Sequence, residues 1–331
     1  MQLRTLIPVL IGTMIVTFSS CRKEPPKIDF YHTPLPSTYD FPFVDYQGQV
    51  ERLDQMEEMM EYIETGNQSG VQLDKAVLNA MFANSNGNAN GNFSFESEKD
   101  IKSKVFEPHL DEFDGYFDAI VEASKSVQTA ENGVAGVMLD DEGKSSRLFD
   151  ANGYEYAELI EKGLMGALCY YQATAVYLSD DKMEVDNEDA AEGEASTMAH
   201  HWDEAYGYLG VSNDFPENTE DLRFWGKYCD RRDAVLGSNE ALSEAFRIGR
   251  AGILWHRYDE RDSAIVLVRK AWEDVCAATA IHYLNSAIAN IGDDFMRNHV
   301  LSEAHGMVKA LFYNPDRRIS SDQIDDVIAL L

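Results

Sequence analysis

The sequence is poor in basic residues and in the motifs of common enzymes. It has 28 lysines and arginines against 58 aspartates and glutamates, which gives a formal net charge of −30. Such a surface repels phosphates, so nucleic acid is excluded as a partner, whereas cations are concentrated near the chain. The chain also lacks Gly-x-Ser-x-Gly, a phosphate-binding glycine loop, Gly-x-Gly-x-x-Gly and His-Glu-x-x-His. These absences argue against the enzyme classes that depend on them.

Cysteine and long apolar runs are scarce as well. The chain has four cysteines, and if Cys21 is acylated, an odd number is left: Cys169, Cys229 and Cys276. All three lie in apolar helical patterns, which predicts buried free thiols rather than a disulfide framework. No run after residue 20 approaches the roughly 20 apolar residues that a membrane span needs.

The N-terminus has the pattern of a secretory signal. A positive region containing Arg4 precedes an apolar run at residues 6–18, which is too short to span a membrane. Phe18-Ser19-Ser20-Cys21 resembles a lipobox, in which signal peptidase cuts before a lipid-modified cysteine. We therefore expect a signal peptide at residues 1–20 and lipidation of Cys21. The alternative is an ordinary cleavable signal with a chance cysteine.

A polar tether is expected at residues 21–46. It begins with Arg22-Lys23-Glu24-Pro25-Pro26, which partly resembles the short charged signals that send some lipoproteins to the outer face of the outer membrane. The lipid is then the membrane anchor. The predicted location is the outer membrane, facing the cell surface or the periplasm.

From Gln47 onward the apolar pattern is helical almost throughout. Apolar residues recur three and four apart, whereas the alternation of a half-buried strand is convincing nowhere. The fold class is therefore predicted to be all-α. The longest predicted helices cover residues 154–178, 239–255, 262–291, 295–312 and 320–331.

A polar connector at residues 211–220, which contains Pro216, is the predicted boundary between two parts of the chain. We expect one helical bundle at residues 47–210 and a second, related one at residues 211–331.

The segment Ala199 to Tyr208 carries the main candidate site. His200 and His201 precede Glu204 by four and three residues, so both imidazoles can share a helix face with its carboxylate. Helical bundles build metal sites from such pairs, and this donor set suits iron, zinc or manganese. We predict a metal site at His201 and Glu204, assisted by His200 and completed by carboxylates of the other half.

A second segment repeats this layout. His299 precedes Glu303 by four residues, and Gly306 follows as Gly207 does in the first segment; His305 takes the place of an aromatic residue. The repeat suggests a duplicated unit and makes His299, Glu303 and His305 secondary metal candidates. Glycine inside a helix is costly and implies close packing. The alternative is therefore that both segments are packing contacts with hydrogen-bonded histidines.

Several blocks carry a family resemblance. They are Gly153 to Tyr156, Lys162 to Ala167, His201 to Tyr208, Ala245 to Ala251 and Leu301 to Gly306. Together they resemble the bacterial lipoprotein family named domain of unknown function 4856. That family is similar to the imelysin-like proteins, which are duplicated helical bundles linked to iron acquisition. The segment from Ala199 to Glu204 matches the imelysin Gly-x-His-x-x-Glu motif except at Ala199.

The resemblance implies a lipoprotein that binds iron, an iron complex or another divalent metal during uptake. One alternative is a non-enzymatic structural partner of an outer-membrane transporter, in which the His–Glu pairs only stabilise the fold. Another is a metallopeptidase, for which the sequence supplies no recognisable nucleophile.

Overall fold

The computed structural model describes residues 35–331. The predicted signal peptide, Cys21 and the tether up to residue 34 lie outside the described residues. Within the described residues, no helix combines the length and the apolar character that a membrane crossing requires.

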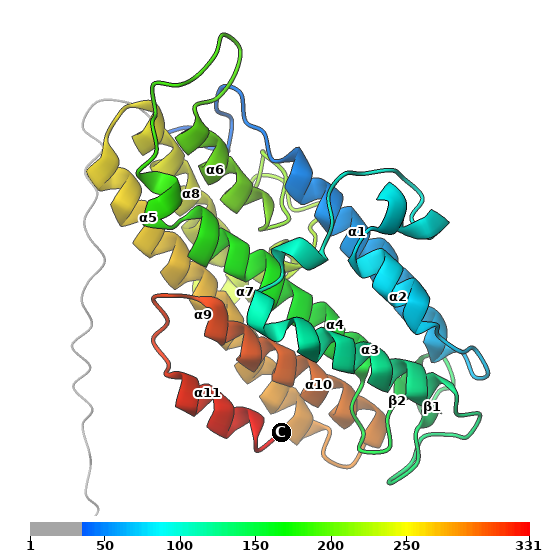
Figure 1. The fold of residues 1–331 in the computed structure, drawn as a ribbon. Coiled ribbons are helices and arrows are strands. Elements are labelled where there is room, and N and C mark those ends of the chain that lie inside the picture. Colours follow the sequence, from blue (N-terminus) through cyan, green and yellow to red (C-terminus); the bar gives the residue numbers. More distant parts are fainter. Residues whose placement is uncertain (1–34) are drawn as a thin grey trace, which may run out of the picture.

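Helices make up most of the fold, so the prediction of an all-α protein is confirmed (Figure 1). The first six are α1 Gln47–Glu64, α2 Lys75–Phe82, α3 Leu110–Ser124, α4 Tyr156–Leu164, α5 Asp180–Met183 and α6 Thr197–Gly207. They are followed by α7 Trp225–Leu236, α8 Ser238–Leu254, α9 Tyr258–Ala289, α10 Asp294–Ala310 and α11 Ser321–Ile328. Two π-helical turns, Met165–Tyr170 and Gln172–Tyr177, prolong α4 almost to the end of the helix predicted there.

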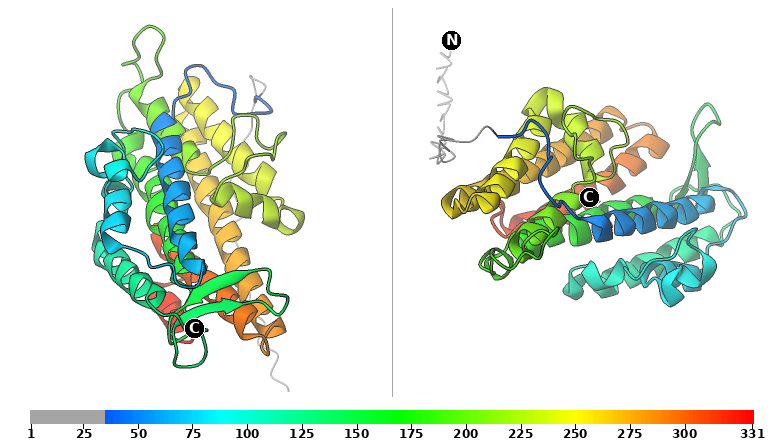
Figure 2. Two further views of the ribbon diagram at one scale, coloured as in Figure 1. Left: turned by 90° about the vertical axis from the view of Figure 1, so that its right-hand side faces the viewer. Right: turned by 90° about the horizontal axis from the view of Figure 1, so that it is seen from above.

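One small sheet accompanies the helices. Strands β1 Gly136–Leu139 and β2 Ser146–Phe149 form an antiparallel hairpin in which Gly136 pairs with Phe149. Each strand has four residues, which is too short for the apolar alternation that reveals a strand in a sequence. Figure 2 shows the hairpin at one end of the helical bundle.

The core joins both predicted halves of the chain. Trp202 of α6, Trp225 of α7 and Trp272 of α9 are fully buried and belong to one continuous apolar cluster. The ring centroids of Tyr170, from the first predicted half, and Trp225, from the second, lie 5.5 Å apart. The boundary at residues 210 and 211 thus crosses a shared core, and the division into two related bundles stays a prediction.

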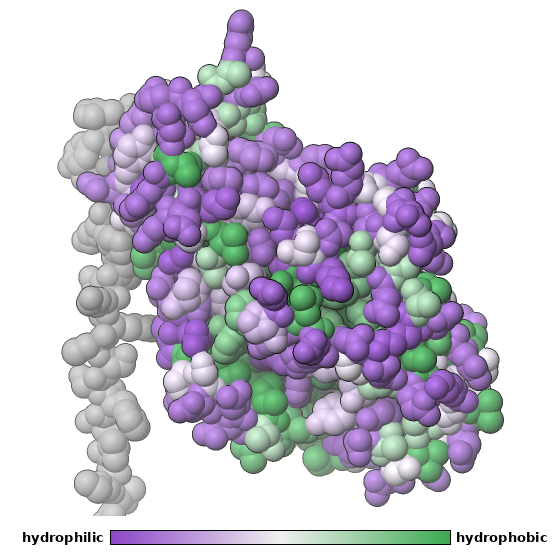
Figure 3. Space-filling model, in the orientation of Figure 1, coloured by the Kyte–Doolittle hydropathy of each residue, from purple (hydrophilic) through white to green (hydrophobic). Residues whose placement is uncertain are grey.

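The buried thiols and the hydrophilic surface agree with what the sequence and its composition predict. Cys169, Cys229 and Cys276 are free and buried, which confirms the prediction made from their apolar surroundings. Hydrophilic side chains cover much of the face drawn in Figure 3, as a net charge of −30 leads one to expect. Hydrophobic residues are scattered between them, which is normal for a folded chain.

Candidate metal centre

The predicted pair on α6 is formed. Ser196 caps this helix by accepting a hydrogen bond from the backbone N–H of Ala199 at 3.2 Å. His201 Nδ1 lies 3.2 Å from Glu204 Oε2, and the more exposed His200 places its Nε2 3.9 Å from the same oxygen. Burial favours the neutral acid, but hydrogen bonds from His201 and Gln49 hold the pKa of Glu204 below its ordinary value.

The helix opposite this pair offers an amide. Gln49 of α1 donates its side-chain N–H to Glu204 Oε1 at 3.1 Å. Gly207 lets α6 approach this segment, since a Cβ added there would lie 2.7 Å from the Cβ of Tyr46. Among residues 35–331, the His201–Glu204 pair is not part of a group of three potential metal ligands lying within 4.8 Å.

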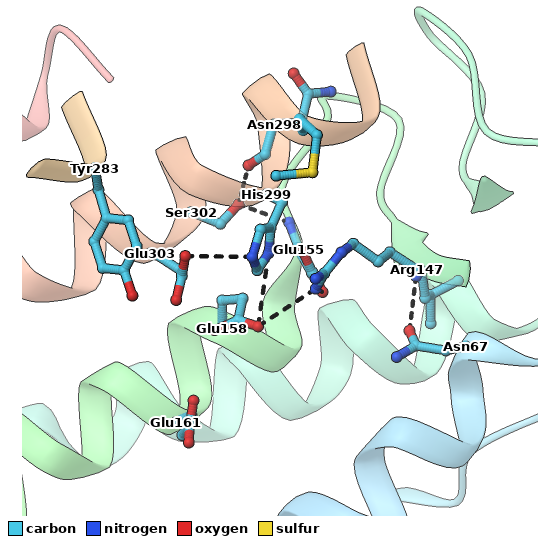
Figure 4. Close-up of polar contacts among 12 residues, drawn as sticks. Asn67, Arg147, Glu155, Glu158, Glu161, Tyr283, Asn298, His299, Ser302 and Glu303 are labelled. Carbon is cyan, nitrogen blue, oxygen red and sulfur yellow. Dashed lines mark hydrogen bonds and ion pairs between the residues drawn. The ribbon is translucent and has the colours of Figure 1, made fainter. Parts of the chain in front are cut away.

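Such a group is found where α10 packs against α4. One ligand atom each from Glu155, Glu158 and His299 lies within 4.8 Å of the others. His299 Nδ1 is 2.8 Å from Glu155 Oε2 and 3.7 Å from Glu158 Oε1. On the other side of the ring, Nε2 is 3.3 Å from Glu303 Oε2. Figure 4 shows the imidazole between these carboxylates.

Close packing of the two helices positions these side chains. The backbone N–H of Glu155, just before α4, donates to the hydroxyl of Ser302 on α10 at 3.0 Å. One turn further along α10, a Cβ added to Gly306 would lie only 2.4 Å from the Cβ of Lys162. Glycine at this position therefore permits the helix approach that brings His299 to the two glutamates.

Two cations complete what we call the α4–α10 cluster, which consists of Arg147, Glu155, Glu158, Glu161, Lys162, His299 and Glu303. Arg147 Nη1, from strand β2, is 2.9 Å from Glu155 Oε1 and 3.6 Å from Glu158 Oε1. Lys162 Nζ is 2.7 Å from Glu158 Oε2 and 3.6 Å from Glu303 Oε1, and it also pairs with Glu161. Four carboxylates thus share two permanent cations.

The protonation of the cluster follows from its charges. Burial alone would lower the pKa of His299, but the carboxylates of Glu155, Glu158 and Glu303 raise it above its ordinary value. Likewise, burial opposes the charge on Lys162, yet Glu158 and Glu161 hold its pKa well above the ordinary value. Lys162 is therefore charged, and His299 gains a proton more readily than an exposed histidine.

The carboxylates respond in opposite directions. Burial raises the pKa of Glu158, but Lys162, His299 and Arg147 outweigh it, and the net shift is downward. In Glu303 burial is the largest effect, and the charge of Glu158 reinforces it, so the pKa is raised. Glu158 is thus the firmer anion. Two carboxylates with one imidazole form a donor set suited to iron, zinc or manganese.

The predicted residues therefore fall in three places. His299 and Glu303 belong to the α4–α10 cluster, whereas His200, His201 and Glu204 lie together on α6. His305 is in neither group: its ring centroid lies 6.2 Å from that of Tyr154, and burial lowers its pKa to about 4.

Sequence reasoning missed the other members of the α4–α10 cluster. Glu155 and Glu158 are three residues apart, a helical spacing that could have marked them. Glu155 lies 144 residues before its partner His299, and Arg147 reaches both glutamates from an unpredicted strand.

Fold and site together define an all-α protein with a largely buried carboxylate–histidine cluster between two packed helices. The chain belongs to the family described as "Domain of unknown function (DUF4856)", whose model matches residues 37–331. The match includes both α4 and α10. Searches of curated proteins and of solved structures found no match to the chain. The likeness to imelysin-like proteins is not tested by these comparisons and stays a prediction.

Proposed function

We propose that the protein is an exported lipoprotein that binds a divalent transition metal through Glu155, Glu158 and His299. The observation that carries the proposal is the convergence of these three ligand atoms within 4.8 Å. Their chemistry suits iron, zinc or manganese. Iron, free or complexed, would be the cargo if the protein serves in uptake.

The charge of the cluster supports a divalent ion. With His299 neutral, four carboxylates and the two cations Arg147 and Lys162 leave a charge of −2. Glu155 is only 1% exposed, so this charge is held in a region of low dielectric constant, where it attracts cations more strongly than at the surface. The net charge of −30 draws cations toward the chain as a whole.

Metal binding at this place requires His299 to give up its proton, since only the neutral imidazole is a ligand. One ring nitrogen would bind the ion, and Glu303, 3.3 Å from Nε2, would hold the ring in orientation. A carboxylate on the far side of a histidine is a common way to fix and strengthen a metal ligand.

A second candidate function, a purely structural one, rests on the contact between α4 and α10. Lys162 is 3% exposed, contacts three carboxylates and packs against Gly306, which are features of a purely structural link between α4 and α10. The protein would then be a non-enzymatic partner of an outer-membrane transporter, with no metal cargo.

Calorimetric titration of the full-length protein with Fe(II), Zn(II) and Mn(II) separates these functions. We expect the double variant Glu158→Gln/His299→Asn to weaken binding by about a hundredfold or more, because losing a ligand costs more than losing the group that orients it. The matched variant His201→Asn/Glu204→Gln should bind as the unchanged protein does. Loss of binding in the second variant alone would move the site to α6, and the absence of binding in all three proteins would favour the structural role.

A further inference from the structure

Arg147 occupies the space beside the ligand oxygens. Its Nη1 lies 2.9 Å from Glu155 Oε1 and 3.6 Å from Glu158 Oε1. A metal ion held by these two carboxylates would be a close neighbour of the guanidinium and would repel it. The arginine and the metal are therefore competing cations for the same pair of glutamates.

Arg147 is also less firmly held than the other cation of the cluster. Its side chain is 25% exposed against 3% for Lys162, and its buried Nε has no hydrogen-bond partner. It extends from β2, a strand of a two-stranded hairpin, rather than from the packed helices. The ring of Phe295, 5.4 Å from the guanidinium carbon, offers it a second contact.

We propose that Arg147 is a built-in counter-cation that limits the metal affinity of the α4–α10 cluster. In the metal-free protein it neutralises Glu155 and Glu158 and so stabilises the empty site. An incoming ion must weaken these ion pairs. Arg147, which lies on the hairpin, therefore lowers the metal affinity of a site whose ligands lie on the α4 segment and α10. This inference rests on the proposed metal binding at Glu155, Glu158 and His299.

Lys162 does not have the same role. Its nitrogen contacts Glu303 and Glu161 besides Glu158, and its Cβ faces Gly306 at the closest approach of the two helices. Moving it would disturb the helix contact itself. Arg147 is the cation whose removal changes the charge at the ligands and leaves the packing of α4 against α10 in place.

The test compares Zn(II) and Mn(II) affinities of the full-length protein and three variants. Arg147→Met removes the competing charge, Arg147→Lys keeps it, and Lys144→Met removes one charge from the exposed turn of the same hairpin. We expect Arg147→Met to lower Kd by about tenfold or more, because it removes a unit charge within a few ångströms of a divalent ion. The other two variants should stay close to the unchanged protein.

Adding His299→Asn to Arg147→Met should abolish the increase in metal affinity. That result would show that the increase arises at the α4–α10 cluster. An Arg147→Met variant that binds as tightly as, or more weakly than, the unchanged protein overturns the inference and leaves the proposed function standing. An equal decrease in Kd for Lys144→Met also overturns the inference, since the decrease would then come from the overall charge of the protein. If no protein binds either metal, the proposed function itself fails.

Discussion

Helices α6 and α10 carry the same short pattern but differ in the helix that each one contacts. In both, a histidine precedes a glutamate by four residues, and a glycine follows three residues later. Gly207 and Gly306 each permit a close helix contact. Opposite α6, Gln49 of α1 presents a neutral amide; opposite α10, the α4 segment presents two glutamates and a lysine.

In both helices the repeated pattern makes a close helix contact, and on α10 it also faces the carboxylates that we propose bind a metal. His201 and Glu204 pair with each other, and Gln49 contacts the remaining carboxylate oxygen. His299 instead meets Glu155 and Glu158 from another helix. The residues that face the pattern, rather than the pattern itself, therefore distinguish the two sites.

The largest expected difference in stability is between variants of the residues that face Glu303 and Glu204. Lys162→Met leaves buried carboxylates without their cation, which should lower the free energy of unfolding by about 3–5 kcal/mol. Gln49→Met removes one neutral donor while Glu204 keeps its contact with His201, so a loss of about 1 kcal/mol is expected. Urea unfolding at pH 7 measures both. Similar losses would mean that the two helix contacts are energetically alike.

The glycines provide the next comparison. Gly306→Ala places a Cβ 2.4 Å from the Cβ of Lys162, and Gly207→Ala places one 2.7 Å from the Cβ of Tyr46. Each change should destabilise the fold by about 1–3 kcal/mol through overpacking, with the larger loss at Gly306. Thermal unfolding at a fixed pH gives the order. A stabilising effect at either position would show that the helices can separate without cost.

The third comparison is a pH dependence of stability that differs between two faces of α10. The pKa of His299 is raised in the folded state, so its contribution is complete below the unfolded pKa and is lost as pH rises through the folded value. The pKa of His305 is lowered to about 4, so its contribution is lost as pH falls from about 6.5 toward 4.

Unfolding free energies of the metal-free protein measured against pH test these signs. His299→Asn should remove the decline on the alkaline side, and His305→Asn should remove part of the decline on the acidic side. Unchanged pH profiles in both variants would contradict the assigned pKa shifts.

Several of these features could be predicted from the sequence because they are local. Apolar residues three and four apart predicted the helices, and the spacing of His299 and Glu303 predicted that they share one face. The buried state of Cys169 followed in the same way from its apolar neighbours.

The composition of the α4–α10 cluster could not be predicted because it depends on distant contacts. Glu155 meets His299 across 144 residues, and no spacing rule connects a residue at the start of α4 with one on α10. Arg147 lies on a four-residue strand, too short for a periodic signal. The pair at His201 and Glu204 gave the stronger sequence signal because its neighbours matched a known motif. No motif includes Gln49, the partner of Glu204 on α1.

Anomalous diffraction from crystals of the protein grown with Zn(II) or Mn(II) would locate a metal bound at the α4–α10 cluster. We expect one strong peak at the absorption edge of the metal, between the carboxylates of Glu155 and Glu158 and a ring nitrogen of His299. A peak at His201 and Glu204 instead, or no peak while the α4–α10 cluster keeps its metal-free ion pairs, would contradict the proposed metal binding.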